Sequence, residues 1–169
     1  MYLTERKKGV IISVAVSLAA IALPVFVGVI LRTTLTSLRE DPDAQAIADK
    51  SQKGLEQEFR ELPSLSQAVV IQDGSMHKIY HGVVSATYKT QKSYEAIKTH
   101  YQHELTSRGW VFKKEDAVLY DRTDYGGKEL VYCKNGYGAS LQYAGRQETE
   151  FGWTFSFGMT WGSVADECK

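Results

Sequence analysis

The feature that most constrains this chain is an uncharged apolar run at residues 10–31, VIISVAVSLAAIALPVFVGVIL. Fourteen of its 22 residues are Val, Ile, Leu or Phe. As a helix rising ~1.5 Å per residue, the run is about 33 Å long, which matches the hydrocarbon thickness of a bilayer. Its large apolar side chains favour insertion by roughly 4–8 kcal/mol. The run therefore predicts a single transmembrane helix, and the sequence after it predicts a tethered, water-soluble domain.

A cleaved secretory signal is the alternative interpretation of this run. Arg6, Lys7 and Lys8 form a positive n-region, and residues 20–22 have the A-x-A shape of a cleavage site. Cleavage there would leave nine further apolar residues at the new N-terminus, and the run exceeds the usual h-region of about 7–15 residues. The sequence therefore favours an uncleaved signal-anchor.

Basic residues predict how this anchor is oriented. Arg6, Lys7 and Lys8 precede the run, whereas only Arg32 closely follows it, so residues 1–9 are expected in the cytoplasm and the rest outside it. Within the span, small residues recur four positions apart and would let a second membrane helix approach closely. These candidate contacts with an integral membrane partner are Ser13, Ala15, Ser17 and Ala19.

Residues 32–66 are interpreted as a connector that contains an amphipathic helix. Asp41 and Pro42 are typical of an N-cap and a first helical residue, so the helix is expected over residues 42–61. Its apolar stripe includes Ile47, Leu55 and Phe59. These side chains pack on the chain's own domain or, alternatively, are presented to a protein partner.

The domain is expected to span residues 67–162, with a C-terminal tail over residues 163–169. Its first part predicts a strand at 68–71, a turn at 73–74 and a long strand at 78–89. Ser93 then begins a helix with one apolar stripe. Gly109 suits the left-handed position after this helix, and Trp110 can fold back on Leu105 as in a Schellman end.

After this helix the sequence predicts only strands and turns. Short strands at 111–112 and 118–120 flank an expected turn at 115–116, and another turn is expected at 124–127. Asn135-Gly136 predicts a hairpin that pairs Cys133 with Gly138. Residues 151–162 alternate large apolar and small residues, which predicts a final strand. Its aromatic face is expected to form the core, the alternative being a binding surface for a flat ligand.

Together these patterns predict an α+β fold. The expected order is ββα followed by an antiparallel meander of four or five strands, with one helix packed on the sheet.

Composition excludes some classes of function. The net charge is zero, and without Glu5, Arg6, Lys7 and Lys8 the remaining chain has 17 Lys and Arg against 19 Asp and Glu. Because nucleic-acid binders usually carry a basic patch, no nucleic-acid partner is expected. Cys133 and Cys168 permit one disulfide if the exported side is oxidising.

The chemistry-bearing residues point to no particular reaction. His100 and His103, with Glu104 beside them, invite a metal-site hypothesis. Both histidines lie largely away from the apolar stripe of the helix, and no recognised metal-ligand spacing is present. No nucleophile elbow, S-x-x-K or P-loop motif occurs. We therefore expect no cofactor, and a protein that is not an enzyme.

One stretch carries a resemblance to known proteins. A strand ending in SATYKT precedes the helix YEAIKTHYQHELTSRGW, in which Tyr101, Leu105, Gly109 and Trp110 form a Tyr-x₃-Leu-x₃-Gly-Trp ending. Residues 78–112 thereby resemble small exported α+β domains of uncharacterised bacterial membrane proteins and lipoproteins. The resemblance implies a fold and a bacterial envelope location, and no activity. With the predicted anchor and its orientation, the expected location is the inner membrane, with the domain outside the cytoplasm.

Two functions fit these observations. The first is a single-pass accessory or assembly subunit of a larger envelope membrane complex, which acts by protein–protein contacts. The second is a membrane-tethered sensor or binding domain for a small molecule or an envelope polymer.

Overall fold

The computed structural model describes residues 41–168. None of the helices in this range is long and apolar enough to cross a membrane. The predicted span at residues 10–31, with its candidate contacts Ser13, Ala15, Ser17 and Ala19, lies outside the described range.

The described part of the chain has an α+β architecture built on one six-stranded antiparallel sheet. Its elements follow one another in the order α2 (Pro42–Glu61), β1 (Val69–Lys78), β2 (His81–Lys89), α3 (Tyr94–Ser107), β3 (Val111–Tyr120), β4 (Thr123–Lys134), β5 (Tyr137–Tyr143), η1 (Gly145–Gln147), α4 (Glu148–Phe151), β6 (Phe155–Gly162) and η2 (Ser163–Cys168).

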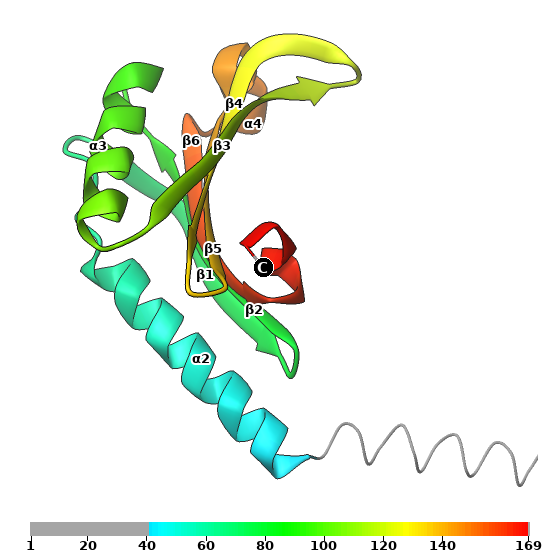
Figure 1. Cartoon of the computed structure of the whole chain (residues 1–169). Coiled ribbons are helices and arrows are strands. Elements are labelled where there is room, and N and C mark those ends of the chain that lie inside the picture. The colour runs from blue at the N-terminus through cyan, green and yellow to red at the C-terminus, as the bar shows by residue number, and fades with distance from the viewer. Residues whose placement is uncertain (1–40, 169) are drawn as a thin grey trace, which may run out of the picture. The chain divides into compact units, whose positions relative to one another are not determined.

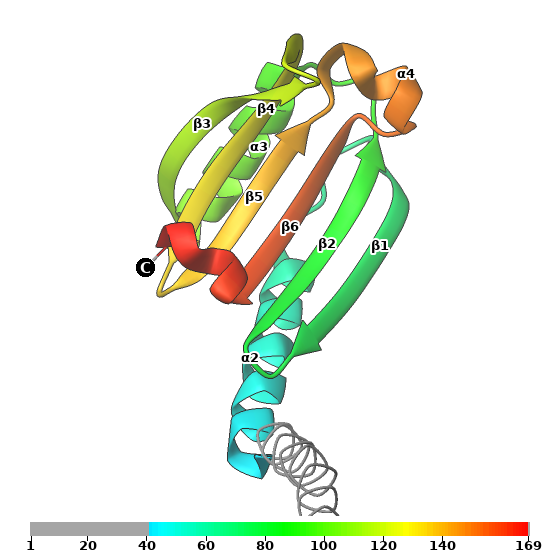
Figure 2. The ribbon, with the colours of Figure 1, turned by 90° about the vertical axis from the view of Figure 1, so that its right-hand side faces the viewer.

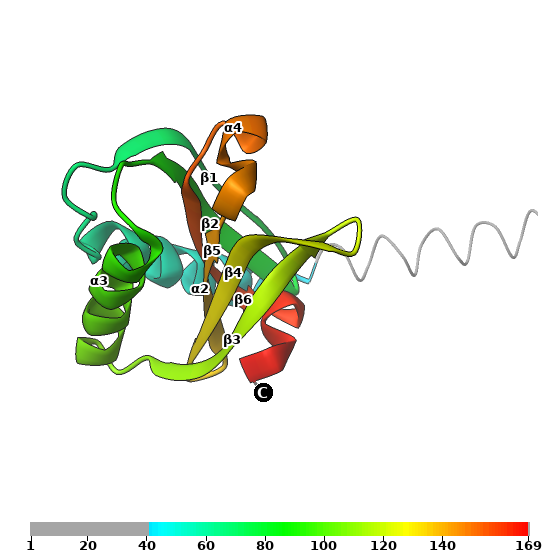
Figure 3. The same ribbon diagram turned by 90° about the horizontal axis from the view of Figure 1, so that it is seen from above.

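The strand order across the sheet is β1-β2-β6-β5-β4-β3. Strands β3 to β6 form a meander, and the last strand then pairs with β2, so β1 and β3 are the two edges. Helices α2 and α3 lie on one face, which we call the helix face, and α4 and η2 lie on the other, the open face (Figures 1 and 3). Figure 2 looks onto the open face, with α4 near one end of the strands and η2 near the other.

The hydrophobic core lies between the sheet and both helices. From the sheet, alternate residues of β2, β4, β5 and β6 point into it because successive strand side chains face opposite ways. From the helices, the core receives Ala48 and Leu55 of α2 and Ile97, Tyr101 and Leu105 of α3. The helix predicted as a connector is therefore part of the domain, and two helices rather than one cover the sheet.

Helix α3 has the ends that its sequence predicts. The Ser93 side chain accepts a hydrogen bond from the Ala96 N–H at the first turn. At the other end Gly109 has φ +82°, the Trp110 N–H donates to the Leu105 carbonyl at 3.0 Å, and the Gly109 N–H donates to that of Thr106. These two bonds define a Schellman motif, which confirms the prediction.

The Asn135-Gly136 hairpin is also confirmed. Both residues have positive φ, of 51° and 79°, and Cys133 pairs with Gly138 as predicted. On the side of the sheet away from Cys133, the hairpin contributes four buried residues to the core: Leu130, Tyr132, Ala139 and Leu141.

The turn predicted at Asp73-Gly74 is wrong. Both residues lie within β1, where Asp73 pairs with Ala86 and Gly74 with Ser85. The chain reverses instead at residues 79–80, where the Tyr80 carbonyl accepts a hydrogen bond from the Ser163 N–H at 3.1 Å. Pairing along the whole length of β2 has overridden the local turn signal.

The turns predicted at residues 115–116 and 124–127 are also wrong, because both segments lie within the paired strands β3 and β4. Glu115 lies inside β3, and the chain turns at Asp121 and Arg122, which both have positive φ. The second segment lies within β4 as a bulge, in which the Gly126 N–H donates to the Asp124 carboxylate at 2.7 Å.

The final strand is shorter than predicted, because β6 begins at Phe155 rather than at Phe151. Phe151 belongs to α4, and Gly152, with φ +76°, ends that helix in the left-handed conformation. Rings of Phe151 and Trp153 stack on each other outside the core, at 5.2 Å between centroids. The large alternate residues of β6 are buried as predicted: Phe155, Phe157, Met159 and Trp161.

Replacing Phe155 with Ala is expected to lower the free energy of unfolding by about 3–5 kcal/mol, because its fully buried ring contacts Tyr88 and Tyr101. Chemical denaturation of both proteins would measure the loss. Phe151→Ala is the matched control and should cost less, since Phe151 is half-buried outside the core. A stable Phe155→Ala protein that loses ligand binding would mean that the aromatic face is a binding surface.

Candidate functional site

The apolar stripe of α2 is used mainly within the domain. Leu55 is 2% exposed, and Phe59 packs on the core with its ring 5.7 Å from that of Phe157. Only Ile47 of the three candidate partner contacts is open, at 66% exposure. The alternative in which the helix packs on its own domain therefore holds for Leu55 and Phe59, and Ile47 remains available on the surface.

The residues of the metal-site hypothesis do not come together with further ligands. His100 Nε2 lies 2.9 Å from the Pro63 carbonyl oxygen, and His103 is exposed on the same helix. Glu104 is half-buried. Across residues 41–168 no group of three or more His, Cys, Asp or Glu side chains is placed to hold a metal ion.

The two cysteines form a disulfide, the single pairing that the sequence permits. Cys133 of β4 is joined to Cys168, with 5.3 Å between their Cα atoms. The bond fixes η2 across the open face, where Lys114 Nζ also lies 2.9 Å from the Glu167 carboxylate. The predicted C-terminal tail is thus folded onto the sheet, and its Ala165 is buried.

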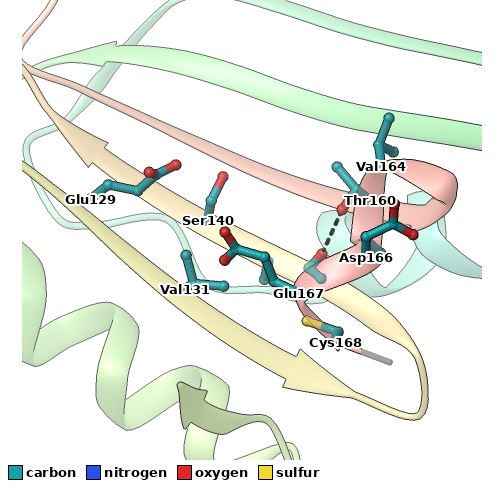
Figure 4. Close-up of a pocket in the computed structure, with 11 residues that line it drawn as sticks. Glu129, Val131, Ser140, Thr160, Val164, Asp166, Glu167 and Cys168 are labelled. Carbon is teal, nitrogen blue, oxygen red and sulfur yellow. Dashed lines mark hydrogen bonds between the residues drawn. The ribbon is translucent and has the colours of Figure 1, made fainter. Parts of the chain in front are cut away.

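A hollow of about 240 Å³ lies beside η2 on the open face (Figure 4). Gly138 leaves room for it, since a Cβ there would lie 2.9 Å from Thr160 Oγ1. Glu129 and Ser140 line it from the strands, and carboxylates of η2 add further negative charge. None of its lining residues is a histidine, lysine or arginine. The hollow can accept a small polar group.

Lys114 of β3 pairs with η2 on this part of the open face. Its hydrogen bonds to Glu167 and Asp116, at 2.9 and 3.0 Å, hold its pKa above the usual lysine value. Lys114 therefore stays protonated as an ion-pair partner and does not serve as a base near neutral pH.

The helix face has a polar contact zone between α2 and β1, which we call the α2–β1 seam. Asp49 accepts a hydrogen bond from His77 at 2.9 Å, and the Ser75 hydroxyl donates to Glu56. Gln52 lies between them, with Nε2 2.7 Å from Ser75 Oγ. Residues 49, 52 and 56 lie on one face of the helix, and residues 75 and 77 lie on one face of the strand. The helical and strand spacings therefore bring these side chains opposite one another.

Gln52 extends this seam into the core. Its side chain is 3% exposed. The Trp161 indole N–H donates to Gln52 Oε1 at 2.8 Å, and Gln52 Nε2 donates to the Val83 carbonyl at 3.2 Å. Both ends of a buried amide are satisfied, which avoids the cost of about 1–3 kcal/mol for an unpaired polar group.

Two hollows open beside the α2–β1 seam. The outer one, of about 250 Å³, is lined by both elements and by β2, and includes Glu56, Asp73 and Ser75. The inner one, of about 190 Å³, has a mixed lining in which aromatic and aliphatic residues outnumber the polar Arg60, Ser64 and Asp73. Its walls include Leu62, Val70, Ala86, Tyr88, Tyr101 and Phe157. Phe59, Arg60 and Asp73 line both hollows, so the two adjoin.

Both edge strands of the sheet expose apolar side chains. All ten residues of β1 are exposed, and Val69, Val70, Ile71 and Met76 are each at least half exposed. Strand β3 exposes Val111, Phe112, Leu119 and Tyr120. We did not predict these two exposed edges from the sequence, because a turn was wrongly predicted in the middle of each edge strand. The uninterrupted apolar run at residues 69–71 was the available signal.

These features define the class of the described domain: an antiparallel α+β sandwich of two layers with free sheet edges and adjoining hollows. Comparison with protein-family models, with curated proteins and with solved structures finds no match to this chain.

Gly82→Ala is expected to destabilise the domain by about 1–3 kcal/mol, because the added Cβ would collide with Gln52 Oε1 and Trp161 Nε1 and break their hydrogen bond. Thermal denaturation would measure this loss. Gly74→Ala, on the neighbouring strand, is the matched control and should be tolerated, since nothing lies within 4 Å of its added Cβ. Equal effects of the two substitutions would contradict the importance of the Gln52 contact.

Removal of the disulfide by Cys133→Ala with Cys168→Ala should lower the free energy of unfolding by roughly 2–4 kcal/mol, because the bond closes a loop with a sequence separation of 35 residues. Hydrogen exchange of residues 163–168 should also accelerate. Glu167→Gln keeps the disulfide and removes only the exposed ion pair with Lys114, so its effect should be much smaller. Unchanged exchange in the double variant would show that η2 is held by other contacts.

The α2–β1 seam should weaken in acid. Hydrogen bonds from Ser75 to Glu56 and from His77 to Asp49 hold the pKa of each carboxyl below its usual value. Their contribution is therefore present above the unfolded pKa values of about 4 and is lost as the pH falls through the folded ones. Ser75→Ala should make the melting temperature less dependent on pH between 2 and 5. An unaltered pH profile in this variant would exclude a role for Glu56.

Proposed function

We propose that this chain is a single-pass, membrane-anchored accessory or assembly subunit of a larger bacterial envelope complex, and that it acts through protein–protein contacts. The apolar run at residues 10–31 supports the anchor. The basic residues before it support an N-terminus in the cytoplasm and a domain on the other side of the inner membrane.

The main support for a role in protein–protein contacts is that both edges of the sheet expose apolar side chains. Each edge strand is ten residues long and exposes four large apolar side chains. Proteins usually cover or interrupt such edges, because free backbone groups and apolar side chains together promote pairing with other chains. A partner that covers an edge would remove this hazard, and binding therefore accounts for the arrangement better than catalysis does.

A tethered binding domain is the second candidate. The aromatic inner hollow beside α2 favours it, since small-molecule sites are usually concave and mostly apolar. The outer hollow, of about 250 Å³, adjoins it and adds polar groups that could orient a ligand.

The first experiment is to cross-link the native membranes, extract them in mild detergent and determine the native mass and composition of the species that contains this chain. The accessory-subunit proposal expects co-migration with a larger complex at fixed stoichiometry. Cross-linking before extraction keeps weak partners attached. Recovery of the cross-linked chain as a lone monomer or homodimer would contradict the proposal and direct attention to ligands of the hollows.

A further inference from the structure

The β1 edge and the two hollows form one continuous groove. Val70, Asp73 and Ser75 are successive helix-face residues of β1, because they pair with the core-facing residues Tyr88, Ala86 and Val84. The register shift around Ile71 takes up the extra residue between the first two. Val70 lines the inner hollow, Ser75 lines the outer one and Asp73 lines both. The hollows therefore follow the edge strand, with α2 as the opposite wall.

The edge determines what kind of occupant fits. β1 pairs with β2 on one side, and no described strand pairs with its other side. The backbone groups on that free side can bond to an extended backbone, which gives affinity without regard to sequence. Side chains of an added strand alternate between the faces, so every second one would point toward the helix face and the hollows.

The lining of the hollows determines the side chains that fit. Most residues around the inner hollow are aromatic or aliphatic, including Phe59, Tyr88 and Tyr101, and the remaining three are Arg60, Ser64 and Asp73. The hollow therefore suits an aromatic or branched apolar side chain that leaves these polar groups exposed to water. The outer hollow carries the carboxylates of Glu56 and Asp73 against the single guanidinium of Arg60. This excess of negative charge suits a basic side chain.

The other edge is less suited to strand addition. The middle of β3 is the charged run 113–116, and three of its members, Lys114, Glu115 and Asp116, are already paired. Lys114 is bound to Glu167, and Glu115 to Lys98 at 2.6 Å. Charged side chains in the middle of an edge strand discourage pairing.

We propose that the groove between β1 and α2 binds an extended peptide segment of a protein partner, which adds a strand beside β1. The segment places an apolar side chain in the inner hollow and a basic side chain, two residues away, in the outer hollow. This inference rests on the proposed function and specifies the surface through which the domain recognises its partner.

The test uses the full chain in lipid nanodiscs and a capped seven-residue peptide. In this probe, threonines alternate with one phenylalanine and one lysine, which lie two positions apart on one face of the extended chain. Hydrogen exchange with mass spectrometry should show saturable protection of residues 69–78 and none of residues 111–120. The same peptide with alternate backbone amides methylated cannot pair as a strand, and should bind at least tenfold more weakly.

Variants of the chain locate the effect. Val70→Lys and Asp73→Lys should each weaken binding of the probe at least tenfold, the first by obstructing the inner hollow and the second by repelling the lysine. Leu119→Lys is the matched control on the other edge and should stay within twofold of the original chain, since Leu119 is similarly exposed. Unchanged melting temperatures would show that the variants are folded.

Three results would overturn the inference: no saturable protection of residues 69–78 at millimolar probe, equal binding of the methylated peptide, or protection of the β3 edge instead. Co-migration of the chain with its native complex distinguishes failure of the groove proposal from failure of the proposed function. A Val70→Lys chain that still joins the native complex would overturn the groove alone. A cross-linked original chain that migrates alone, together with specific binding of the probe, would overturn the accessory-subunit role and leave the groove in place.

Discussion

The domain depends on the pairing of β6 with β2. Strand β6 lies between β2 and β5, so it joins the β1–β2 hairpin to the rest of the sheet. Its apolar side supports both helices at once, because the Phe157 ring stacks on that of Tyr101 in α3 at 4.7 Å and on that of Phe59 in α2. A strand near the C-terminal end thus holds the first helix of the described range. Contacts between residues so far apart in the sequence are expected to slow folding, because closing the long intervening loop costs entropy.

The α2–β1 seam explains why a groove exists beside β1. Toward the middle of α2, the helix meets the hairpin through long polar side chains, and Gln52 alone bonds to Trp161, Ser75 and the Val83 carbonyl. These bonds have fixed geometry, so they position the helix without filling the space beside it. Further along α2, Phe59 turns toward the sheet and forms the wall of both hollows. The groove therefore lies where the polar contacts of α2 are followed by the apolar packing of Phe59 and Leu62.

Local signals predicted the parts of this fold that local chemistry determines. The caps of α3, the Asn135-Gly136 hairpin and the start of α2 at Pro42 each depend on residues close together in the sequence. The failed turn predictions have another cause: Asp73-Gly74 and Glu115-Asp116 have turn chemistry, but each lies in a strand that pairing with the next strand holds extended. The candidate groove could not be predicted, because it depends on β1 being an edge, and the sheet order that makes it one comes from the distant pairing of β6.

The placement of apolar surface distinguishes the edges from the open face. Small and hydroxyl-bearing residues cover the middle of the open face, where Ser85, Gly158 and Ser140 lie side by side across three strands. One end of this face is already occupied by η2, which the disulfide and the Lys114 ion pair hold in place. Eight of the large exposed apolar residues lie instead along β1 and β3, where backbone groups are also free, whereas Val164 of η2 is the one that lies beside the open-face hollow. A free edge offers bonds to any extended chain, whereas a hollow accepts only side chains of suitable size and charge. In the proposed mode of binding, their coincidence along β1 lets that edge discriminate among extended segments by the size and charge of their side chains.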